Sequence, residues 1–188
     1  MRIFGIDPGS IRTGYGCVET DGSRHRLVAS GALSAPPKAT FPEKLDAIHR
    51  GLTELLARTR PGCVVIETLF YAKNVRSALR LGHARGVAVL AATQAGLQVF
   101  EYSPAEVKRA VVGYGRAEKT QVQQMVALLL GLDVPPAPHD ASDALAIALC
   151  HSHSRPPPGA PAVALDSLAA SAARPRSWRQ YQPAGSKR

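Results

Sequence analysis

The spacing of apolar positions changes about forty residues into the chain, and the change separates expected strands from expected helices. Residues 2–7 form a short apolar run without a helical period, and residues 14–19 and 24–33 are further strand-like segments. Asp21-Gly22-Ser23 is a typical hairpin turn between the second and third of them. Strands joined by such short connections pair antiparallel, so the sequence predicts a three-stranded meander.

A helical period follows the meander. One stripe carries apolar residues three or four positions apart, namely Phe41, Leu45, Ile48, Leu52, Leu55 and Leu56. Pro42 suits the first turn of this helix, and Pro61-Gly62 ends it. The apolar run of residues 63–66 is too short for a helix and rich in β-branched residues. It predicts a strand that is buried on both faces, central and parallel to its neighbours.

The helix expected over residues 75–95 has an unusual number of small residues, which are Gly82, Ala84, Gly86, Ala88, Ala91 and Ala92. Small side chains allow a second element to approach closely, although each glycine costs a helix about 1 kcal/mol. Two interpretations remain open from the sequence: the small face packs inside the domain, or it forms the interface of a dimer.

The remaining elements alternate strand and helix up to residue 154. A fifth strand is expected over residues 97–102, and Ser103-Pro104-Ala105-Glu106 is a capping box that opens a short helix. Residues 113–116 predict a flexible basic loop, residues 118–130 a helix, and residue 139 or 140 starts the last helix. Residues 155–188 hold six prolines and six basic residues against one acidic residue, so a disordered basic tail is expected there.

Composition adds a polyanionic partner to this outline. Lysine and arginine outnumber aspartate and glutamate by 23 to 14, which gives a net charge of +9, and such a surplus in a small domain favours nucleic acid. The three cysteines lie far apart without metal-ligand spacing, so free buried thiols in a reducing compartment are expected. Neither a signal peptide nor a membrane-spanning run is present in the sequence, and we expect a cytoplasmic protein.

Four carboxylates stand where an active site is expected. Asp7 and Glu67 each follow an apolar strand, and Asp140 and Asp143 are three residues apart, so they share one face of the last helix. Simpler roles exist for two of them, because aspartate is common in turns and Asp140 could cap its helix. A converging set of acids needs neutralisation, which Mg²⁺ or Mn²⁺ provides through oxygen ligands. Two such ions support phosphodiester hydrolysis, so the sequence predicts a metal-dependent nuclease.

The order of elements and acids resembles the ribonuclease H-like fold, and most closely the RuvC-type Holliday junction resolvases. The motifs that carry this resemblance span residues 1 to about 153; they are Gly5-Ile6-Asp7-Pro8-Gly9, Thr13-Gly14-Tyr15-Gly16, Ile66-Glu67 with Phe70, Ala72-Lys73-Asn74, Ala78-Leu79, Gly82-His83-Ala84-Arg85-Gly86, Tyr102-Ser103-Pro104, Val107-Lys108, Val112-Gly113, Ala117-Glu118-Lys119 and Asp140 to Ala146. The resemblance implies an α/β fold whose five-stranded mixed sheet, three antiparallel strands and then two parallel ones, is flanked by helices. The nuclease domain would occupy residues 1–154.

The resemblance also implies an activity and a site. The activity is the symmetric nicking of two opposing strands of a four-way DNA junction by a homodimer, in recombination and repair, leaving 5′-phosphate ends. The implied partner is a branch-migration complex. The implied catalytic and metal-binding set, with two Mg²⁺ or Mn²⁺ ions, is Asp7, Glu67, Asp140 and Asp143. Some members of the family use histidine in the fourth position, which leaves His139 and Asp140 as alternatives for the fourth ligand. The three-residue spacing to Asp143 favours Asp140, and His139 is kept as a neighbouring group that orients a ligand or handles a proton.

Basic and aromatic residues complete the site that the resemblance implies. It places Lys108 and Lys119 near the scissile phosphate and Phe70 against unpaired bases at the crossover, where stacking is worth about 1–3 kcal/mol per base. The full set of expected DNA-binding residues is Lys108, Lys119, Phe70, Lys73, Asn74, Arg76 and Arg116.

Three other functions remain as alternatives. A different ribonuclease H-like nuclease would share the acids but act on another nucleic acid. An actin-like sugar or acetate kinase has a similar Asp-x-Gly-x-x-x-x-Gly loop, matched by Asp7, Gly9 and Gly14, but 188 residues leave no room for its second domain. A non-catalytic DNA-binding module would leave the carboxylates unexplained.

Overall fold

The computed structural model describes residues 1–21, 23–68 and 74–154. The chain divides into two units, Met1–Arg155 and Pro156–Arg188. The tail expected from residue 155 onward lies outside the described residues, and the description that follows concerns the first unit alone.

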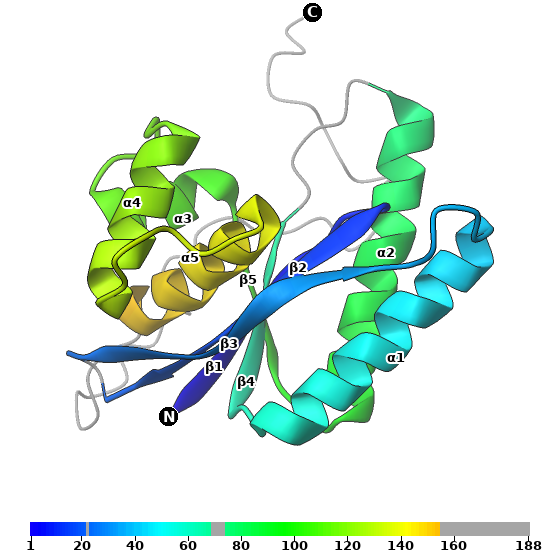
Figure 1. The fold of residues 1–188 in the computed structure, drawn as a ribbon, viewed down its shortest axis with the longest axis horizontal. Helices are drawn as coiled ribbons and strands as arrows, with labels where there is room; N and C mark the ends of the chain where they lie inside the picture. Colours follow the sequence, from blue (N-terminus) through cyan, green and yellow to red (C-terminus); the bar gives the residue numbers. More distant parts are fainter. Residues whose placement is uncertain (22, 69–73, 155–188) are drawn as a thin grey trace, which may run out of the picture. The chain divides into compact units, whose positions relative to one another are not determined.

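In the part of the chain that the structure describes, five strands form one mixed sheet in the order β3-β2-β1-β4-β5 (Figure 1). Their bounds are Arg2–Asp7 (β1), Arg12–Thr20 (β2), His25–Ser34 (β3), Cys63–Glu67 (β4) and Val99–Tyr102 (β5). The first three strands pair antiparallel, whereas β4 pairs parallel with both β1 and β5. The predicted meander and the predicted central parallel strand are therefore confirmed, with strand ends that differ from the expected ones by one or two residues.

Within the described residues, five helices cover the two faces of the sheet. They are α1 (Phe41–Thr59), α2 (Val75–Gln94), α3 (Pro104–Val112), α4 (Lys119–Leu130) and α5 (His139–Ser154). Helices α1 and α2 lie on one face, and α3, α4 and α5 lie on the other (Figure 1). Among the described residues, no helix is long and apolar enough to cross a membrane.

The two-residue period of a strand divides the core between these faces. In β1, Ile3 belongs to the cluster under α3, α4 and α5, whereas Phe4 and Ile6 belong to the cluster under α1 and α2. The same division holds in β4, where Val65 faces the first cluster and Val64 the second. Strands β1 and β4 are thus buried on both sides, which fits their parallel pairing at the centre of the sheet.

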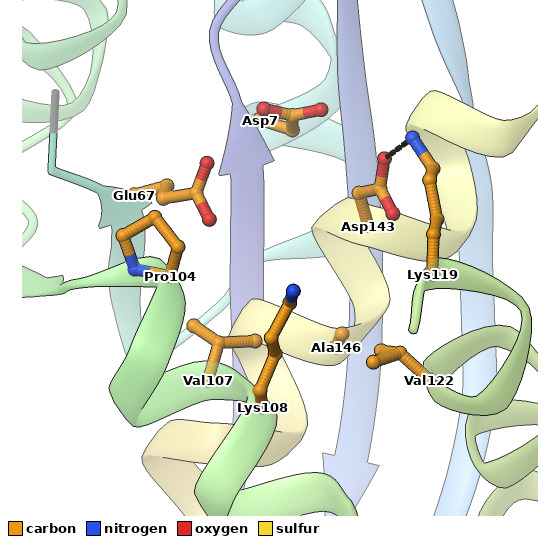
Figure 2. A pocket seen from close by; sticks show the side chains of 9 residues that line it. All are labelled: Asp7, Glu67, Pro104, Val107, Lys108, Lys119, Val122, Asp143 and Ala146. Carbon is orange, nitrogen blue, oxygen red and sulfur yellow. Dashed lines mark ion pairs between the residues drawn. The ribbon is translucent and has the colours of Figure 1, made fainter. Parts of the chain in front are cut away.

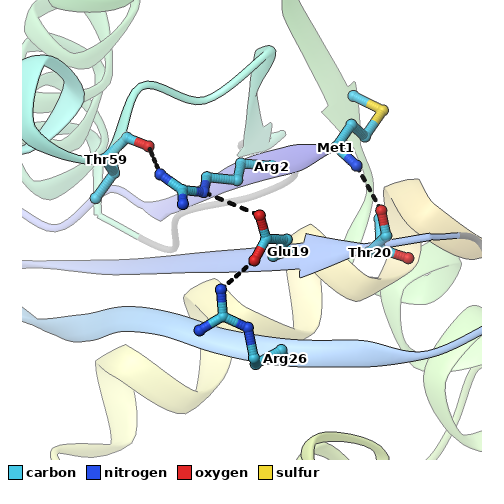
Figure 3. A network of polar contacts seen from close by, with 6 residues as sticks. All are labelled: Met1, Arg2, Glu19, Thr20, Arg26 and Thr59. Carbon is cyan, nitrogen blue, oxygen red and sulfur yellow. Dashed lines mark hydrogen bonds and ion pairs between the residues drawn. The ribbon is translucent and has the colours of Figure 1, made fainter.

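Ion pairs and hydrogen bonds tie together the end of the sheet where β1 begins (Figure 3). The Glu19 carboxylate on β2 binds Arg2 on β1, with Nε 3.3 Å from Oε1, and also binds Arg26 on β3. Arg2 additionally donates from Nη1 to the Thr59 carbonyl oxygen at 2.9 Å, which links β1 to the end of α1. These contacts fix the register of three strands at the end remote from Asp7.

Helix α2 resolves the question of the small residues in part. Ala84, Ala88, Ala91 and Ala92 are buried against the sheet and α1, so the alanines pack inside the domain. Gly82 and Gly86 have no atom within 4 Å of where a Cβ would stand, so they face away from the domain.

Candidate active site

The alternation of the strands places two of the predicted acids on one face of the sheet. Asp7 follows Ile3 and Gly5 at two-residue intervals, and Glu67 follows Cys63 and Val65 in the same way. The parallel register Ile6↔Ile66 makes the next positions, Asp7 and Glu67, neighbours at the carboxyl ends of adjacent strands. Both carboxylates therefore point to the face that α5 covers, where Asp143 lies.

Glycines let α5 lie directly on the strands. A Cβ on Gly5 would stand 2.0 Å from the Ala144 carbonyl oxygen, and a Cβ on Gly14 would stand 2.0 Å from that of Asp140. Gly16 is equally restricted, because its Cβ would meet the Leu145 side chain at 2.6 Å. The backbone of α5 thus approaches β1 and β2 as closely as only glycine permits, and this approach brings its first turn to Asp7.

The acids surround a cavity of about 210 Å³ whose lining residues are Asp7, Glu67, Pro104, Val107, Lys108, Lys119, Val122, Asp143 and Ala146. Figure 2 shows Glu67 and Asp143 on opposite sides of the cavity with Asp7 above and between them, and Lys108 points toward them from α3. Lys119 extends from the start of α4 and places Nζ 2.5 Å from Asp143 Oδ2. Two of the seven expected DNA-binding residues, Lys108 and Lys119, therefore share the cavity with three of the four acids.

The carboxylates in the cavity outnumber the lysines, three to two, and burial together with this excess negative charge raises the pKa values of two of the acids. Burial, followed by the charges of Glu67, Asp143 and Asp140, raises the pKa of Asp7 to about 7. Burial and the Asp143 charge also raise the pKa of Glu67, against the opposing effect of Lys119 and Lys108. The hydrogen bond that Lys119 donates to the Asp143 carboxylate raises the pKa of Lys119, so this ammonium stays charged. A perturbed acid of this kind in a cleft is typical of a functional site.

The donor set fits a hard divalent cation, because it consists of carboxylate oxygens that lack enough positive charge around them. The side-chain arrangement differs from a finished metal centre: across the described residues, no group of three or more histidine, cysteine, aspartate or glutamate side chains is positioned to hold an ion. Lys119 occupies one oxygen of Asp143 in this arrangement. An ion that bound through Oδ2 of Asp143 would therefore have to replace Lys119 at that oxygen.

Asp140 and His139 lie beside the cavity but do not line it. Asp140 Oδ2 is 3.6 Å from Arg12 Nη1, and its charge still acts on Asp7. His139 Nδ1 is 2.8 Å from Nε2 of the buried Gln123, which donates to it because an amide nitrogen carries only hydrogens. Gln123 thus fixes the orientation of the His139 ring. Neither His139 nor Asp140 lines the cavity, so Asp140 as the fourth ligand stays a prediction.

The other expected DNA-binding residues are dispersed. Arg116 is exposed in the loop between α3 and α4, and Arg76 is exposed in the first turn of α2. Asn74 caps α2, with Oδ1 accepting from the backbone nitrogens of Arg76 and Ser77 at 2.9 and 3.2 Å. Phe70 and Lys73 lie outside the described residues.

Several residues that shape the site were not predicted from the sequence. They include Pro104, Val107, Val122 and Ala146 in the cavity wall, and Arg12 and Gln123 beside the acids. The spacing Gly14-x-Gly16 could have indicated close approach of a helix, because alternate glycines in a strand leave one face bare. The remaining residues carry no local signal, since each meets a partner from a distant element.

The three cysteines are buried and form no disulfide, as expected. Burial raises the pKa of both Cys17 and Cys150 to about 11. Thiols with such pKa values stay protonated at neutral pH, which leaves the acidic cavity as the candidate active site in the part of the chain that the structure describes.

A five-stranded mixed sheet with acids at the ends of β1 and β4 and on α5, flanked by lysines, defines a nuclease of the ribonuclease H-like class. The family described as crossover junction endodeoxyribonuclease RuvC matches residues 3–151. The chain belongs to this family, and it is an endonuclease that acts on DNA.

Individual relatives match over nearly their whole length. RuvC of Chloroflexus aggregans is 51% identical over 156 residues, which cover 83% of this chain and 95% of that protein. RuvC of Pelotomaculum thermopropionicum is 52% identical over 153 residues, or 81% and 93% of the two chains. The structure of T. thermophilus RuvC in complex with a Holliday junction substrate is 38% identical, with a TM-score of 0.78, and the match covers 81% of this chain and 93% of that one.

Proposed function

We propose that the chain resolves Holliday junctions by nicking two opposing strands symmetrically near the crossover, in recombination and DNA repair. The reaction is hydrolysis of phosphodiesters that leaves 5′-phosphate and 3′-hydroxyl ends. It depends on Mg²⁺ or Mn²⁺, with two ions in each active site of a homodimer. The observation that carries the proposal is the cavity in which Asp7, Glu67 and Asp143 face Lys108 and Lys119.

The carboxylates hold the ions. Asp7 and Glu67 project from neighbouring strands, Asp143 projects from α5, and Asp140 stands close enough to influence the charge of Asp7. Mg²⁺ or Mn²⁺ held by these acids would balance their negative charge and supply activation of the attacking water and stabilisation of the leaving oxygen. Asp143 becomes available for this role when Lys119 turns from it toward a DNA phosphate.

The lysines bind the backbone of the DNA. Lys119 is accessible to DNA, because its side chain is 59% exposed although it contacts Asp143. Lys108 lines the cavity from the other side and lowers the pKa of Glu67 through its charge. Lysine ammonium groups contact phosphate as point charges and position the backbone without reading its sequence. Together the two lysines hold the scissile phosphate over the acids.

A synthetic mobile four-way junction tests the reaction. With Mg²⁺ or Mn²⁺ we expect paired nicks near the crossover and religatable 5′-phosphate ends, while a linear duplex of the same sequence stays intact. Equal cutting of linear duplex would overturn the junction specificity. Asp7→Asn should abolish cleavage and preserve junction binding, whereas the exposed control Asp46→Asn should leave both unchanged. Retained cleavage by Asp7→Asn would remove Asp7 from the reaction.

The exposed face of α2 supports the homodimer. Val75, Leu79 and Leu90 have relative exposures of 76%, 61% and 49%, and Gly82 and Gly86 leave room for a close neighbour. Sedimentation of wild type should give a dimer at micromolar concentration, and Leu79→Glu should give a monomer. Leu128→Glu on α4 is the matched control, because Leu128 is 72% exposed on another face. A strictly monomeric wild type would contradict this arrangement.

We assign the cellular context by family membership. The chain works in the cytoplasm beside the branch-migration complex that moves junctions. We expect that complex to co-purify with junction-bound wild type. It should be absent when a variant that cannot bind the junction is used.

A further inference from the structure

Two histidines meet at the end of the sheet that is remote from the acidic cavity. His25 is the first residue of β3, and His153 lies in the last turn of α5. Their Nε2 atoms are 3.2 Å apart, and their ring centroids are separated by 5.1 Å with a 58° angle between the ring planes. His25 pairs with Thr20 in the sheet, whereas Asp7 pairs with Gly14 near the other end of β2. The nuclease chemistry does not use this pair.

The contacts of His153 determine which of its nitrogens is free. Nδ1 lies 3.0 Å from the Ala110 carbonyl oxygen on α3. A carbonyl can only accept, so Nδ1 carries the proton and Nε2 of the neutral ring presents its lone pair. Histidines that bind metals are commonly held in this way, by an Nδ1–H donated to a backbone carbonyl. His153 Nε2 is therefore oriented as a ligand.

The ring of His25 is also suited to bind through Nε2. Burial and the neighbouring His153 lower the pKa of His25, which outweighs the opposite effect of Asp21 and favours the neutral ring. Because His153 Nε2 can only accept, the 3.2 Å contact places the proton of the metal-free His25 ring on Nε2. Nδ1 of His25 is buried without a hydrogen-bond partner among the described residues, so this proton moves from Nε2 to Nδ1 when an ion binds. Both rings can then present unprotonated Nε2 atoms to the same point.

The separation of these atoms matches a shared ion. Zn–N bonds of about 2.0–2.1 Å at a tetrahedral angle place two ligand nitrogens about 3.3 Å apart, and the observed separation is 3.2 Å. The carboxyl end of α5 adds negative potential from its last carbonyl groups, which favours a cation.

We propose that His25 and His153 form a binding site for Zn²⁺ or a similar late first-row divalent cation, with water in the remaining positions. No third histidine, cysteine or carboxylate within the described segments is placed to join them. Imidazole ligands favour zinc, copper and nickel over Mg²⁺, so the site is chemically distinct from the acidic cavity. The ion links β3 to α5 and, through Ala110, to α3, and these two helices carry Asp143 and Lys108 at the active site.

Thermal unfolding of the untagged protein in excess Mg²⁺, with increasing Zn²⁺, tests the site. Wild type should show a Tm that rises with Zn²⁺, because an ion that binds only the folded state stabilises it. The rise should disappear in His25→Ala and in His153→Ala. It should persist in His49→Ala, where the lost ring contacts Gln94 on the other face of the sheet. An equal rise in His153→Ala, or none in wild type, would overturn the proposal and leave the pair as a plain hydrogen bond.

A direct measurement on wild type avoids dependence on the stability of the variants. Side-chain ¹H–¹⁵N spectra resolve the imidazole nitrogens of all six histidines. On addition of Zn²⁺ in excess Mg²⁺, the Nε2 resonances of His25 and His153 should shift together while those of His49 and His83 stay unchanged. Shifts confined to His139, beside the acidic cavity, would refute the site.

Discussion

Gly14→Ala tests whether the close approach of α5 to the sheet positions the catalytic acids. Gly14 lies opposite Asp7 in the pairing of β1 with β2, and its missing side chain makes room for the backbone of α5. The added Cβ would stand 2.0 Å from the Asp140 carbonyl oxygen and 2.5 Å from the Asp140 carbonyl carbon. Both are backbone atoms, so no rotation of a side chain relieves the clash.

The size of the effect follows from the distance that must be recovered. An ordinary contact of a Cβ begins at 3.4 Å, so strand and helix must separate by about 1.4 Å, the difference between 3.4 and 2.0 Å. Misplacing a catalytic group by about 1 Å costs about 100-fold in rate, which corresponds to about 2.7 kcal/mol of activation free energy. Overpacking of this kind also lowers the free energy of unfolding by about 1–3 kcal/mol.

Single-turnover cleavage of a synthetic four-way junction measures this effect. The cleavage rate of Gly14→Ala should fall about 100-fold, while junction binding in EDTA changes little because the lysines on α3 and α4 are untouched. Gly62→Ala is the matched control, since its Cβ would meet Met1 Cε at 3.5 Å and the Arg2 carbonyl oxygen at 3.6 Å, which are ordinary contacts. Rates are compared below the melting temperatures of all three proteins.

The result that refutes this reasoning is specific. A folded Gly14→Ala protein that cleaves at the wild-type rate would show that the position of α5 does not limit the reaction. An equal loss of rate in Gly62→Ala would show that the assay responds to any added methyl group near the sheet. Weakened binding with an unchanged cleavage rate at saturating protein would also contradict a role in positioning the acids.

Three further predictions concern the acids, a lysine and the thiols. The pKa of Asp7 is raised from 3.8 to about 7, so the folded state keeps a proton that the unfolded state loses, and the free energy of unfolding falls as pH rises from 3.8 to 7. Asp7→Asn should therefore have a higher Tm than wild type in EDTA at pH 8, and the difference should vanish near pH 4. A difference in Tm that does not depend on pH would contradict the raised pKa. Lys119→Ala removes the ammonium that lowers the pKa values of Asp7 and Glu67. The rate of junction cleavage should fall about 10- to 100-fold, or about 1.4–2.7 kcal/mol of activation free energy, while the variant Lys38→Ala of an exposed lysine keeps the wild-type rate. Equal rates in both variants would show that Lys119 has no role in cleavage. The folded protein should react with a thiol reagent at pH 8 only as fast as it unfolds, because Cys17, Cys63 and Cys150 are buried; rapid labelling of any one of them in native buffer would show that its burial is incomplete.

The elements of the fold could be predicted because their signals are local. The apolar run of residues 63–66 indicated a central parallel strand, and β4 pairs parallel on both sides. The capping box at Ser103 and Glu106 opens α3 as expected, with the Ser103 backbone nitrogen 2.7 Å from Glu106 Oε2. The hydrophobic period, the helix caps and the turn residues each depend on a few neighbouring positions, so they can be recognised in the sequence alone.

The acids at the ends of strands were predictable for the same reason. Asp7 and Glu67 occupy the position after an apolar run, and adjacent parallel strands end at the same edge of a sheet. Asp143 carried a weaker signal, as one carboxylate in an alanine- and leucine-rich helix. Family resemblance, more than spacing, joined the four acids into one set and added Lys108 and Lys119.

Only the tertiary structure decided how these groups meet. Lys119 contacts Asp143 across 24 positions of sequence, Arg12 contacts Asp140 across 128, and His25 meets His153 across the same distance. Each contact depends on the packing of α4 or α5 against a distant strand, which in turn depends on glycines that remove side chains from the face of the sheet. The sequence by itself determined which residues could do chemistry at the strand ends. Packing of elements remote along the chain decided which of them face one cavity, because no local pattern encodes the distance between two elements.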